Sequence, residues 1–205
     1  VLEAGLVNAP LFFPFRYNLG LCYLNLFDLK SSLLHFEKAV LLVPEYSRTY
    51  LQIGYLHQRF NRESLAIQYF REALRRNAKE LDTFILIGDI FFRRRQLEMA
   101  QKYYDTALRI DPLFPNGLLG RAKIYFIEGS YHRCIVLLKS IDTSREYDIA
   151  LHYYWAEASF KLRDYETARV QYEKLLTFQT DRFFLTTSPA LIKHKLEITH
   201  RFTNP

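Results

Sequence analysis

Residues 47–80 read SRTYLQIGYLHQRFNRESLAIQYFREALRRNAKE, and this stretch decides the fold because its pattern returns on either side at a spacing of 34 residues. The clearest sign is a small residue that recurs at the same position in five successive copies: Gly20, Gly54, Gly88, Ala122 and Ala156. A fixed period of this length, without insertions, is typical of proteins built from repeated supersecondary units.

The copies start at Phe13, Ser47, Leu81, Pro115 and Ile149, and positions within a copy are called places 1 to 34. Place 20 is always small: Ser32, Ala66, Ala100, Cys134 and Ala168. Place 24 is always bulky: Phe36, Phe70, Tyr104, Leu138 and Tyr172. Because offsets of three and four put residues on one face of a helix, the pattern predicts two helices per copy. Short turns such as Asn61-Arg62 would make the two helices antiparallel neighbours.

The pattern resembles the tetratricopeptide repeat, W-x2-L-G-x2-Y followed by A-x3-F-x2-A and P. The best matches are Leu19-Gly20-x2-Tyr23 with Phe36, Ala39 and Pro44; Ile53-Gly54 with Ala66, Phe70 and Ala73; and Ile87-Gly88-x2-Phe91 with Ala100, Tyr104, Ala107 and Pro112. The fourth and fifth copies depart most, with Arg121 where the family usually has Leu. The resemblance implies an all-α, right-handed α-solenoid of five 34-residue helix-turn-helix repeats.

The expected division of the chain follows the period. Residues 1–12 are predicted to be the tail of a preceding repeat, so that the native array is longer. The repeats occupy 13–46, 47–80, 81–114, 115–148 and 149–182, and residues 183–205 form a capping helix and tail. Ser188-Pro189 predicts the start of that helix, which ends at about Phe202 and presents polar residues to solvent at the end of the array.

Composition excludes several classes of protein. The chain has 28 Lys and Arg against 22 Asp and Glu, and no apolar run approaches the roughly 18 residues of a membrane span. Two cysteines, Cys22 and Cys134, are too few for a disulfide framework, and no Cys or His pair has metal-ligand spacing. Both cysteines are predicted to be buried and inert. We therefore expect a soluble helical protein without a metal or cofactor.

A second stripe on each first helix is the candidate binding surface. Places 4, 8 and 11 would face the partner helix, whereas the family resemblance assigns places 2, 5, 9 and 12 to the concave surface. The predicted peptide-binding groove comprises Tyr17, Leu21, Leu24, Leu51, Tyr55, Gln58, Ile85, Asp89, Phe92, Leu119, Arg121, Lys123, Phe126, Tyr153, Glu157 and Phe160. An apolar stripe left to solvent would mark an interaction site. The alternative is that the aromatic residues at place 12 pack between repeats as core.

The stripe also indicates the kind of partner. The Lys and Asn clamp with which some family members hold a terminal carboxylate is absent, because the matching places hold Tyr17, Leu21, Gln52, Asp82 and Leu86. An apolar or amphipathic segment of a protein is therefore the expected ligand. Arg121 would either extend toward the groove or pair with a carboxylate.

Other kinds of function find less support. The basic run Arg93-Arg94-Arg95 lies among interleaved acidic residues, so nucleic acid is disfavoured as a partner. Six histidines are scattered over different places, no catalytic motif is present, and Asp89 and Glu157 are interpreted as surface charges. The predicted function is a non-catalytic protein-protein interaction scaffold.

Two alternatives remain open at this point. The first is a self-assembling structural subunit of a large envelope, secretion, pilus or flagellar machine. The second is an accessory arm of an enzyme or a nucleic-acid-binding protein. The sequence does not predict a cellular compartment.

Overall fold

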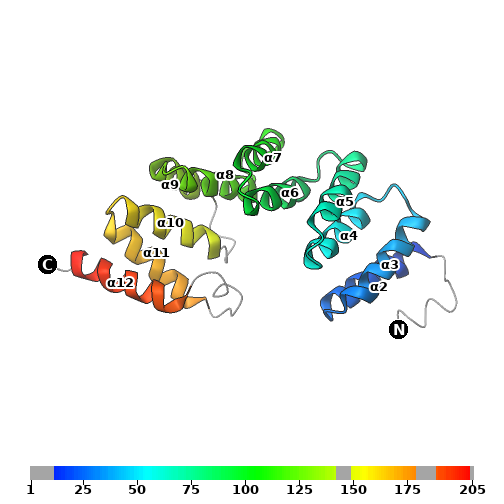
Figure 1. Cartoon of the computed structure of the whole chain (residues 1–205), viewed down its shortest axis with the longest axis horizontal. Helices are drawn as coiled ribbons and strands as arrows, with labels where there is room; N and C mark the ends of the chain where they lie inside the picture. The colour runs from blue at the N-terminus through cyan, green and yellow to red at the C-terminus, as the bar shows by residue number, and fades with distance from the viewer. Residues whose placement is uncertain (1–11, 142–148, 179–187, 204–205) are drawn as a thin grey trace. The chain divides into compact units, whose positions relative to one another are not determined.

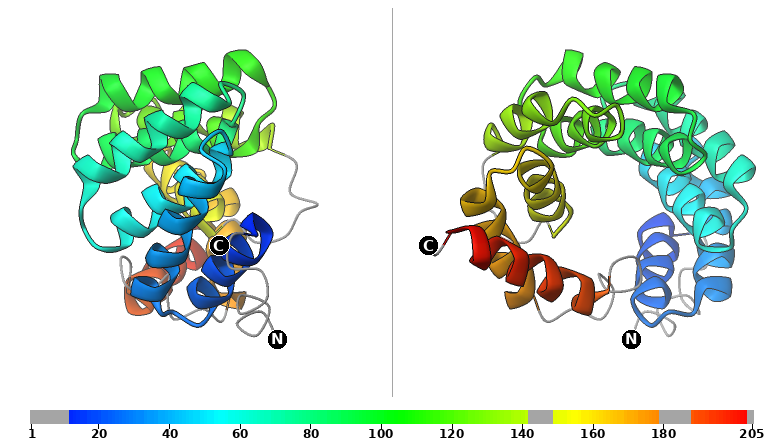
Figure 2. Two further views of the ribbon diagram at one scale, coloured as in Figure 1. Left: turned by 90° about the vertical axis from the view of Figure 1, so that its right-hand side faces the viewer. Right: turned by 60° about the vertical axis from the view of Figure 1, so that its left-hand side comes forward.

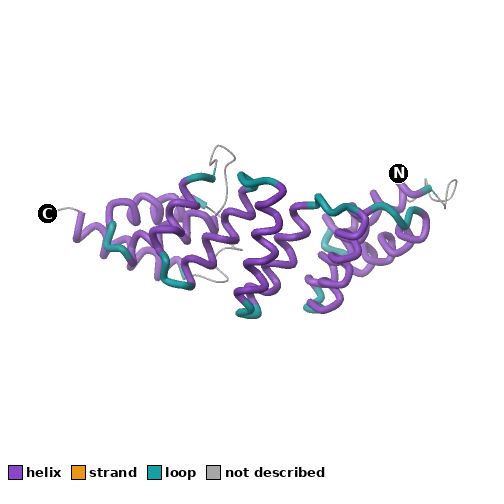
Figure 3. Tube along the Cα trace, turned by 90° about the horizontal axis from the view of Figure 1, so that it is seen from above, coloured by secondary structure: helices purple, strands orange, loops and turns teal. Residues whose placement is uncertain are grey.

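A computed structural model describes residues 12–141, 149–178 and 188–203, which form eleven helices joined by short loops (Figure 1). No strand occurs among these residues (Figure 3). Successive helices pack as hairpins, which confirms the predicted all-α repeat fold. The predicted tail of a preceding repeat lies outside the described residues, except for Phe12. By its contacts the chain divides into two compact units, Val1–Ile90 and Phe91–Pro205.

Unit 1 contains two complete hairpins and most of a further helix. Its helices are α2 (Phe13–Asn25), α3 (Leu29–Leu42), α4 (Ser47–Arg59), α5 (Glu63–Arg76) and α6 (Leu81–Arg93), the last of which crosses the boundary. Helix α2 packs along α3, α4 packs along α5, and α3 also contacts α4 (Figure 2). Phe36, Ile53 and Leu56 are the buried centre of one core cluster in this unit.

Unit 2 continues the same arrangement and ends in a single helix. Its helices are α7 (Leu97–Ile110), α8 (Pro115–Ile127), α9 (Tyr131–Lys139), α10 (Ile149–Lys161), α11 (Tyr165–Thr177) and α12 (Pro189–Thr203). Helix α12 packs against α11, where Ile192 is 1% exposed within the cluster formed by Ala156, Tyr172 and Leu175. The helix predicted after Ser188 is therefore present and covers apolar side chains of the fifth copy.

The small residue at place 8 lets an aromatic ring of the second helix approach the first helix. A Cβ built on Gly54 would lie 2.6 Å from the ring of Phe70, and one built on Gly20 would lie 2.7 Å from Phe36. Place 20 supports the same contact, because the Ser32 hydroxyl donates a hydrogen bond to the Gly20 carbonyl oxygen at 2.8 Å. Place 8 faces the partner helix here, as the sequence predicts. Its tightest neighbour is the ring at place 24 and not the small residue at place 20.

The turns between paired helices repeat in detail. Place 15 has a positive φ in every copy: Phe27 (60°), Asn61 (57°), Arg95 (60°), Gly129 (76°) and Arg163 (62°). The next amide N–H donates back to the carbonyl at place 11, as Arg62 does to His57 at 2.8 Å. This pattern resembles the Schellman ending of a helix, which reverses the chain within a few residues. The turns therefore form at the predicted positions, although only one of the five residues with positive φ is a glycine.

Aromatic stacking adds a contact between the two helices of three copies. The rings at places 11 and 23 stack in Tyr23 with His35, His57 with Tyr69, and Phe91 with Tyr103, with centroids 5.3, 5.1 and 5.5 Å apart. Stacked rings add roughly 0.5 to 1.5 kcal/mol beyond the area that they bury. The family pattern names only place 11, so its partner at place 23 is a feature that the structure adds.

The two cysteines differ in their surroundings. Cys134 at place 20 is buried, as predicted, and burial raises the pKa of its thiol to about 12. Cys22 at place 10 is exposed, so the prediction of a buried thiol was wrong there. Place 10 lies outside the places that face another helix, and this explains the difference.

Candidate functional site

The predicted groove residues at places 5, 9 and 12 are called the first-helix stripe, and each unit carries its own part of this stripe. In unit 1 the stripe consists of Tyr17, Leu21, Leu24, Leu51, Tyr55, Gln58, Ile85 and Asp89. Ile85 is buried, with 8% of its surface exposed, and the other seven are half-buried. The stripe of unit 1 is therefore an accessible and mainly apolar surface.

Helix α4 shows how the stripe differs from the core. Ile53 and Leu56 are 1% and 0% exposed within the cluster around Phe36. Leu51 and Tyr55 lie on the same helix and stay half-buried. Since the core positions of α4 are already filled, these two side chains leave apolar surface accessible next to a packed core.

Other stripe residues of unit 1 rest on the core beneath them. Tyr17 meets the ring of Phe36 edge-on, with centroids 5.4 Å apart, and meets Tyr46 edge-on at 5.3 Å. Leu21 and Leu24 pack against the same Phe36 cluster. These contacts fix one side of each stripe residue and leave the other side accessible.

In unit 2 the stripe contains Phe92, Leu119, Lys123, Phe126, Tyr153, Glu157 and Phe160. Leu119 is buried at 5% exposure, whereas Phe92, Lys123, Phe126 and Tyr153 are half-buried. The Phe126 ring meets Tyr131 of its own copy at 5.5 Å and Tyr154 of the next copy at 5.3 Å, both edge-on. This ring therefore takes part in packing between copies while part of it remains accessible.

Glu157 is buried, at 6% exposure, so its interpretation as a surface charge was wrong. The Lys195 ammonium on α12 donates to both carboxylate oxygens at 2.6 Å, and the Tyr172 hydroxyl donates to one of them at 2.8 Å. Burial, together with the adjacent carboxylate, raises the pKa of Tyr172. The Lys195 ammonium also lies 5.5 Å from the centre of the Phe160 ring. In the fifth copy α12 thus engages two residues of the predicted groove.

Arg121 pairs with a carboxylate, which was one of its two predicted arrangements. Its Nε lies 3.0 Å from Oδ1 of Asp105 on α7, and its Nη2 donates to the Tyr125 hydroxyl at 3.0 Å. The guanidinium carbon lies 4.8 Å from the centre of the Tyr125 ring. The side chain therefore joins α8 to the preceding helix. The sequence could not identify this partner, because the family pattern does not specify the place of Asp105.

The chemistry of the described residues suits the binding of a partner. None of their His, Cys, Asp and Glu side chains form a group of three or more that could hold a metal ion. Within the same ranges no helix has both the length and the apolar character needed to cross a bilayer. The stripes combine apolar and aromatic side chains with a few charges, and this chemistry suits non-covalent binding.

Comparison with known proteins identifies the family. The sequence profile described as tetratricopeptide repeat matches residues 13–46, 47–80 and 81–112, which are the first three copies. Solved tetratricopeptide repeat structures share the fold of the chain. The chain belongs to the tetratricopeptide repeat family, whose members are generally non-catalytic scaffolds for protein-protein interaction.

The TPR repeat-containing protein YpiA of Bacillus subtilis (strain 168) is 25% identical over 145 residues, which cover 70% of this chain and 34% of that protein. The chain thus spans about a third of this relative. The crystal structure of the APC/C hetero-tetramer Cut9-Hcn1 aligns with a TM-score of 0.78 at 14% identity, over 100% of this chain and 39% of that one. YrrB, described as a TPR protein with an unusual peptide-binding site, aligns with a TM-score of 0.61 at 15% identity, over 89% and 94%. These likenesses concern the fold.

Proposed function

We propose that the chain holds an apolar or amphipathic segment of another protein against its first-helix stripes. It would act as an assembly scaffold without a catalytic step of its own. The contrast along α4 carries the proposal, since Leu51 and Tyr55 remain accessible beside the fully buried Leu56. Accessible apolar residues repeated at fixed places give a partner several anchor points on one scaffold.

The charges of the stripes favour an amphipathic ligand over a purely apolar one. The stripe of unit 1 includes Asp89, and the stripe of unit 2 includes Lys123, each half-buried among apolar residues. Charged groups beside apolar anchors select the orientation of a ligand and contribute less to its affinity. The peptide-binding site named for YrrB is in keeping with this class of ligand, although its similarity to the chain is one of fold.

The fifth copy would contribute differently. Glu157 is already bonded to Lys195 and Tyr172, and Phe160 lies beneath the same ammonium. A ligand that paired with Glu157 would have to displace the Lys195 ammonium. We therefore assign binding in unit 2 to the half-buried rings of Phe92 and Phe126.

Affinity capture from an extract, with quantitative mass spectrometry, tests the proposal in unit 1. Leu51→Arg places a charge on the stripe, and Ser64→Arg places the same charge on an exposed position of α5 as a matched control. The proposal expects Leu51→Arg to lose a set of proteins that both wild type and the Ser64→Arg variant retain. If both variants captured the same proteins equally, the stripe of unit 1 would not be part of the binding surface.

The molar mass of the purified chain, measured as a function of its concentration, distinguishes partner binding from self-assembly. A stripe that binds other proteins leaves the purified chain monomeric as its concentration rises. The molar mass of an assembly subunit would instead rise with concentration, and this rise need not depend on Leu51.

A further inference from the structure

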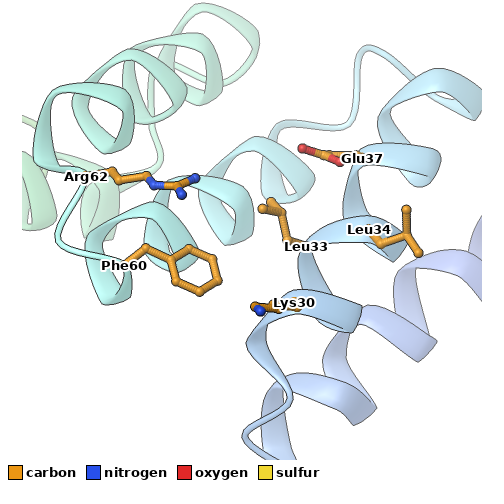
Figure 4. A pocket seen from close by; sticks show the side chains of 6 residues that line it. All are labelled: Lys30, Leu33, Leu34, Glu37, Phe60 and Arg62. Atoms are coloured by element: carbon orange, nitrogen blue, oxygen red, sulfur yellow. The ribbon is translucent and has the colours of Figure 1, made fainter.

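A separate pocket lies in unit 1, away from the first-helix stripe. It is a cavity of about 250 Å³ between α3 and the turn that joins α4 to α5 (Figure 4). Its lining residues are Lys30, Leu33, Leu34, Glu37, Phe60 and Arg62, and we call it the α3–turn pocket. None of these residues belongs to the predicted groove. In Figure 4 the Leu33 side chain points toward Phe60 and Arg62 across the pocket.

The apolar wall of the α3–turn pocket is held in place by the core. Leu33 and Phe60 both pack against the buried cluster around Phe36, so their positions do not depend on a ligand. Leu34 is 48% exposed, and it contributes further accessible apolar surface to the pocket. A wall that is already ordered lowers the entropy lost when a ligand binds.

The charged side chains of the pocket form no ion pair or side-chain hydrogen bond among the residues that the structure describes. Neither the Lys30 ammonium nor the Arg62 guanidinium forms an ion pair or hydrogen bond with another described residue. The Glu37 carboxylate is likewise unpaired among the described residues. The Arg62 guanidinium carbon lies 5.6 Å from the centre of the Phe60 ring, so the cation borders the apolar wall. Two cations and one carboxylate beside apolar side chains complement a ligand that is acidic and apolar.

The repeat fold itself does not require these cations. Lys30 occupies place 18 of the first copy, and Arg62 occupies place 16 of the second, neither of which the family pattern specifies. The same two places in later pairs of copies hold Ser64 with Gln96, Glu98 with Ser130, and His132 with Asp164. The combination of two basic residues therefore occurs once in the array, next to Leu33 and Phe60.

We propose that the α3–turn pocket binds a protein segment in which a side-chain carboxylate adjoins an aliphatic residue. The carboxylate would lie between Lys30 and Arg62, and the aliphatic side chain would pack on Leu33 and Phe60. Glu37 would repel a second nearby anion and accept a hydrogen bond from a backbone N–H of the ligand. This carboxylate also disfavours a phosphodiester strand, which brings a row of negative charges.

Fluorescence anisotropy with a defined probe tests the proposal. The probe is a terminally blocked, fluorescein-labelled peptide in which glutamates alternate with leucines. Three other ligands serve for comparison. One is the same peptide with lysine in place of glutamate, the second is the peptide with serine in place of leucine, and the third is a labelled single-stranded oligonucleotide. Wild-type chain should bind the first peptide and discriminate against the other three ligands by roughly tenfold or more, because each lacks one part of the complementarity.

Charge reversal locates the site. The double variant Lys30→Glu/Arg62→Glu should lose affinity for the glutamate peptide by roughly tenfold or more and gain affinity for the lysine peptide. The matched control is Lys38→Glu, an exposed position of α3 that does not line the pocket, and it should bind as wild type does. Circular dichroism verifies that each variant is folded.

Three results would overturn the proposal. They are a dissociation constant weaker than about 1 mM for the glutamate peptide, equal losses in Lys38→Glu and the double variant, or preference for the oligonucleotide. The test is independent of the first-helix stripe, since Leu51→Arg leaves the pocket unchanged. Loss of stripe binding and loss of pocket binding are therefore separate observations.

Discussion

The Lys195 ammonium on α12 lies 2.6 Å from both carboxylate oxygens of the buried Glu157 on α10. This pair connects the last helix of the chain to the first helix of the fifth copy across 38 residues of sequence. A buried carboxylate that loses its cation is costly, whereas replacing both partners with neutral groups often is not. Removing one partner of this pair should therefore destabilise the protein more than replacing both.

Lys195→Ala should lower the free energy of unfolding by about 3 kcal/mol, because among the described residues Glu157 would keep only the Tyr172 hydroxyl as a partner. The double variant Glu157→Gln/Lys195→Met should recover most of the loss. Urea unfolding followed by tryptophan fluorescence of Trp155 measures both changes. If the losses in free energy of unfolding of Glu157→Gln and Lys195→Met simply added up in the double variant, the two side chains would not interact.

Gly54→Leu should destabilise unit 1 by at least about 2 kcal/mol, because its Cβ would lie 2.6 Å from the Phe70 ring. Gly129→Leu is not a useful control, since φ at that residue is +76°. Ser64→Leu instead tests the same side chain at an exposed helical position. Thermal unfolding should separate the two variants clearly, and similar midpoints would contradict the close contact.

Arg163→Gly should stabilise the protein by roughly 0.5 to 1 kcal/mol, since an L-residue at φ 62° is strained and glycine is not. The Arg163 side chain is exposed, so its removal sacrifices little packing. Gly129→Ala at the same place of the preceding copy should have the opposite effect. A lower midpoint for Arg163→Gly in differential scanning calorimetry would argue against strain at this turn.

Cys22 should react with iodoacetamide quickly and Cys134 only when the protein opens. Cys22 is exposed, whereas Cys134 is buried and has its pKa raised to about 12 by that burial. The nucleophilic thiolate of Cys134 is thus both scarce at neutral pH and shielded from the reagent. Peptide mapping after brief alkylation should find the label on Cys22, and equal labelling of both would contradict the packing at place 20.

The sequence predicts the fold well because the repeat restricts the same places many times over. Phe13, Ser47, Leu81, Pro115 and Ile149, the predicted first residues of the copies, are also the first residues of α2, α4, α6, α8 and α10. Small residues at places 8 and 20 and bulky residues at place 24 recur in every copy, and this recurrence predicts the paired helices from the sequence. The same reasoning correctly locates the turns, although it does not predict positive φ at a residue such as Phe27.

The candidate site is less predictable, because its contacts join places that the repeat leaves variable. Glu157 belongs to the regular array, whereas Lys195 follows the point at which the period ends, so no spacing rule connects them. Asp105 and Arg121 are adjacent only after two copies have packed. The α3–turn pocket likewise depends on variable places, so the repeat pattern does not predict it. The role of the first-helix stripe as a binding surface remains a prediction.

If this scaffold binds partner proteins through its first-helix stripe, the double variant Phe92→Ala/Phe126→Ala should weaken that binding. Binding of a protein captured by the wild-type chain is measured by isothermal titration calorimetry, alongside circular dichroism of the free variant. Affinity should fall on the order of a hundredfold, while helix content is retained and the melting temperature falls modestly. Unchanged affinity in a folded variant would show that the stripe does not bind the partner, and loss of the helical fold would show that both rings belong to the core.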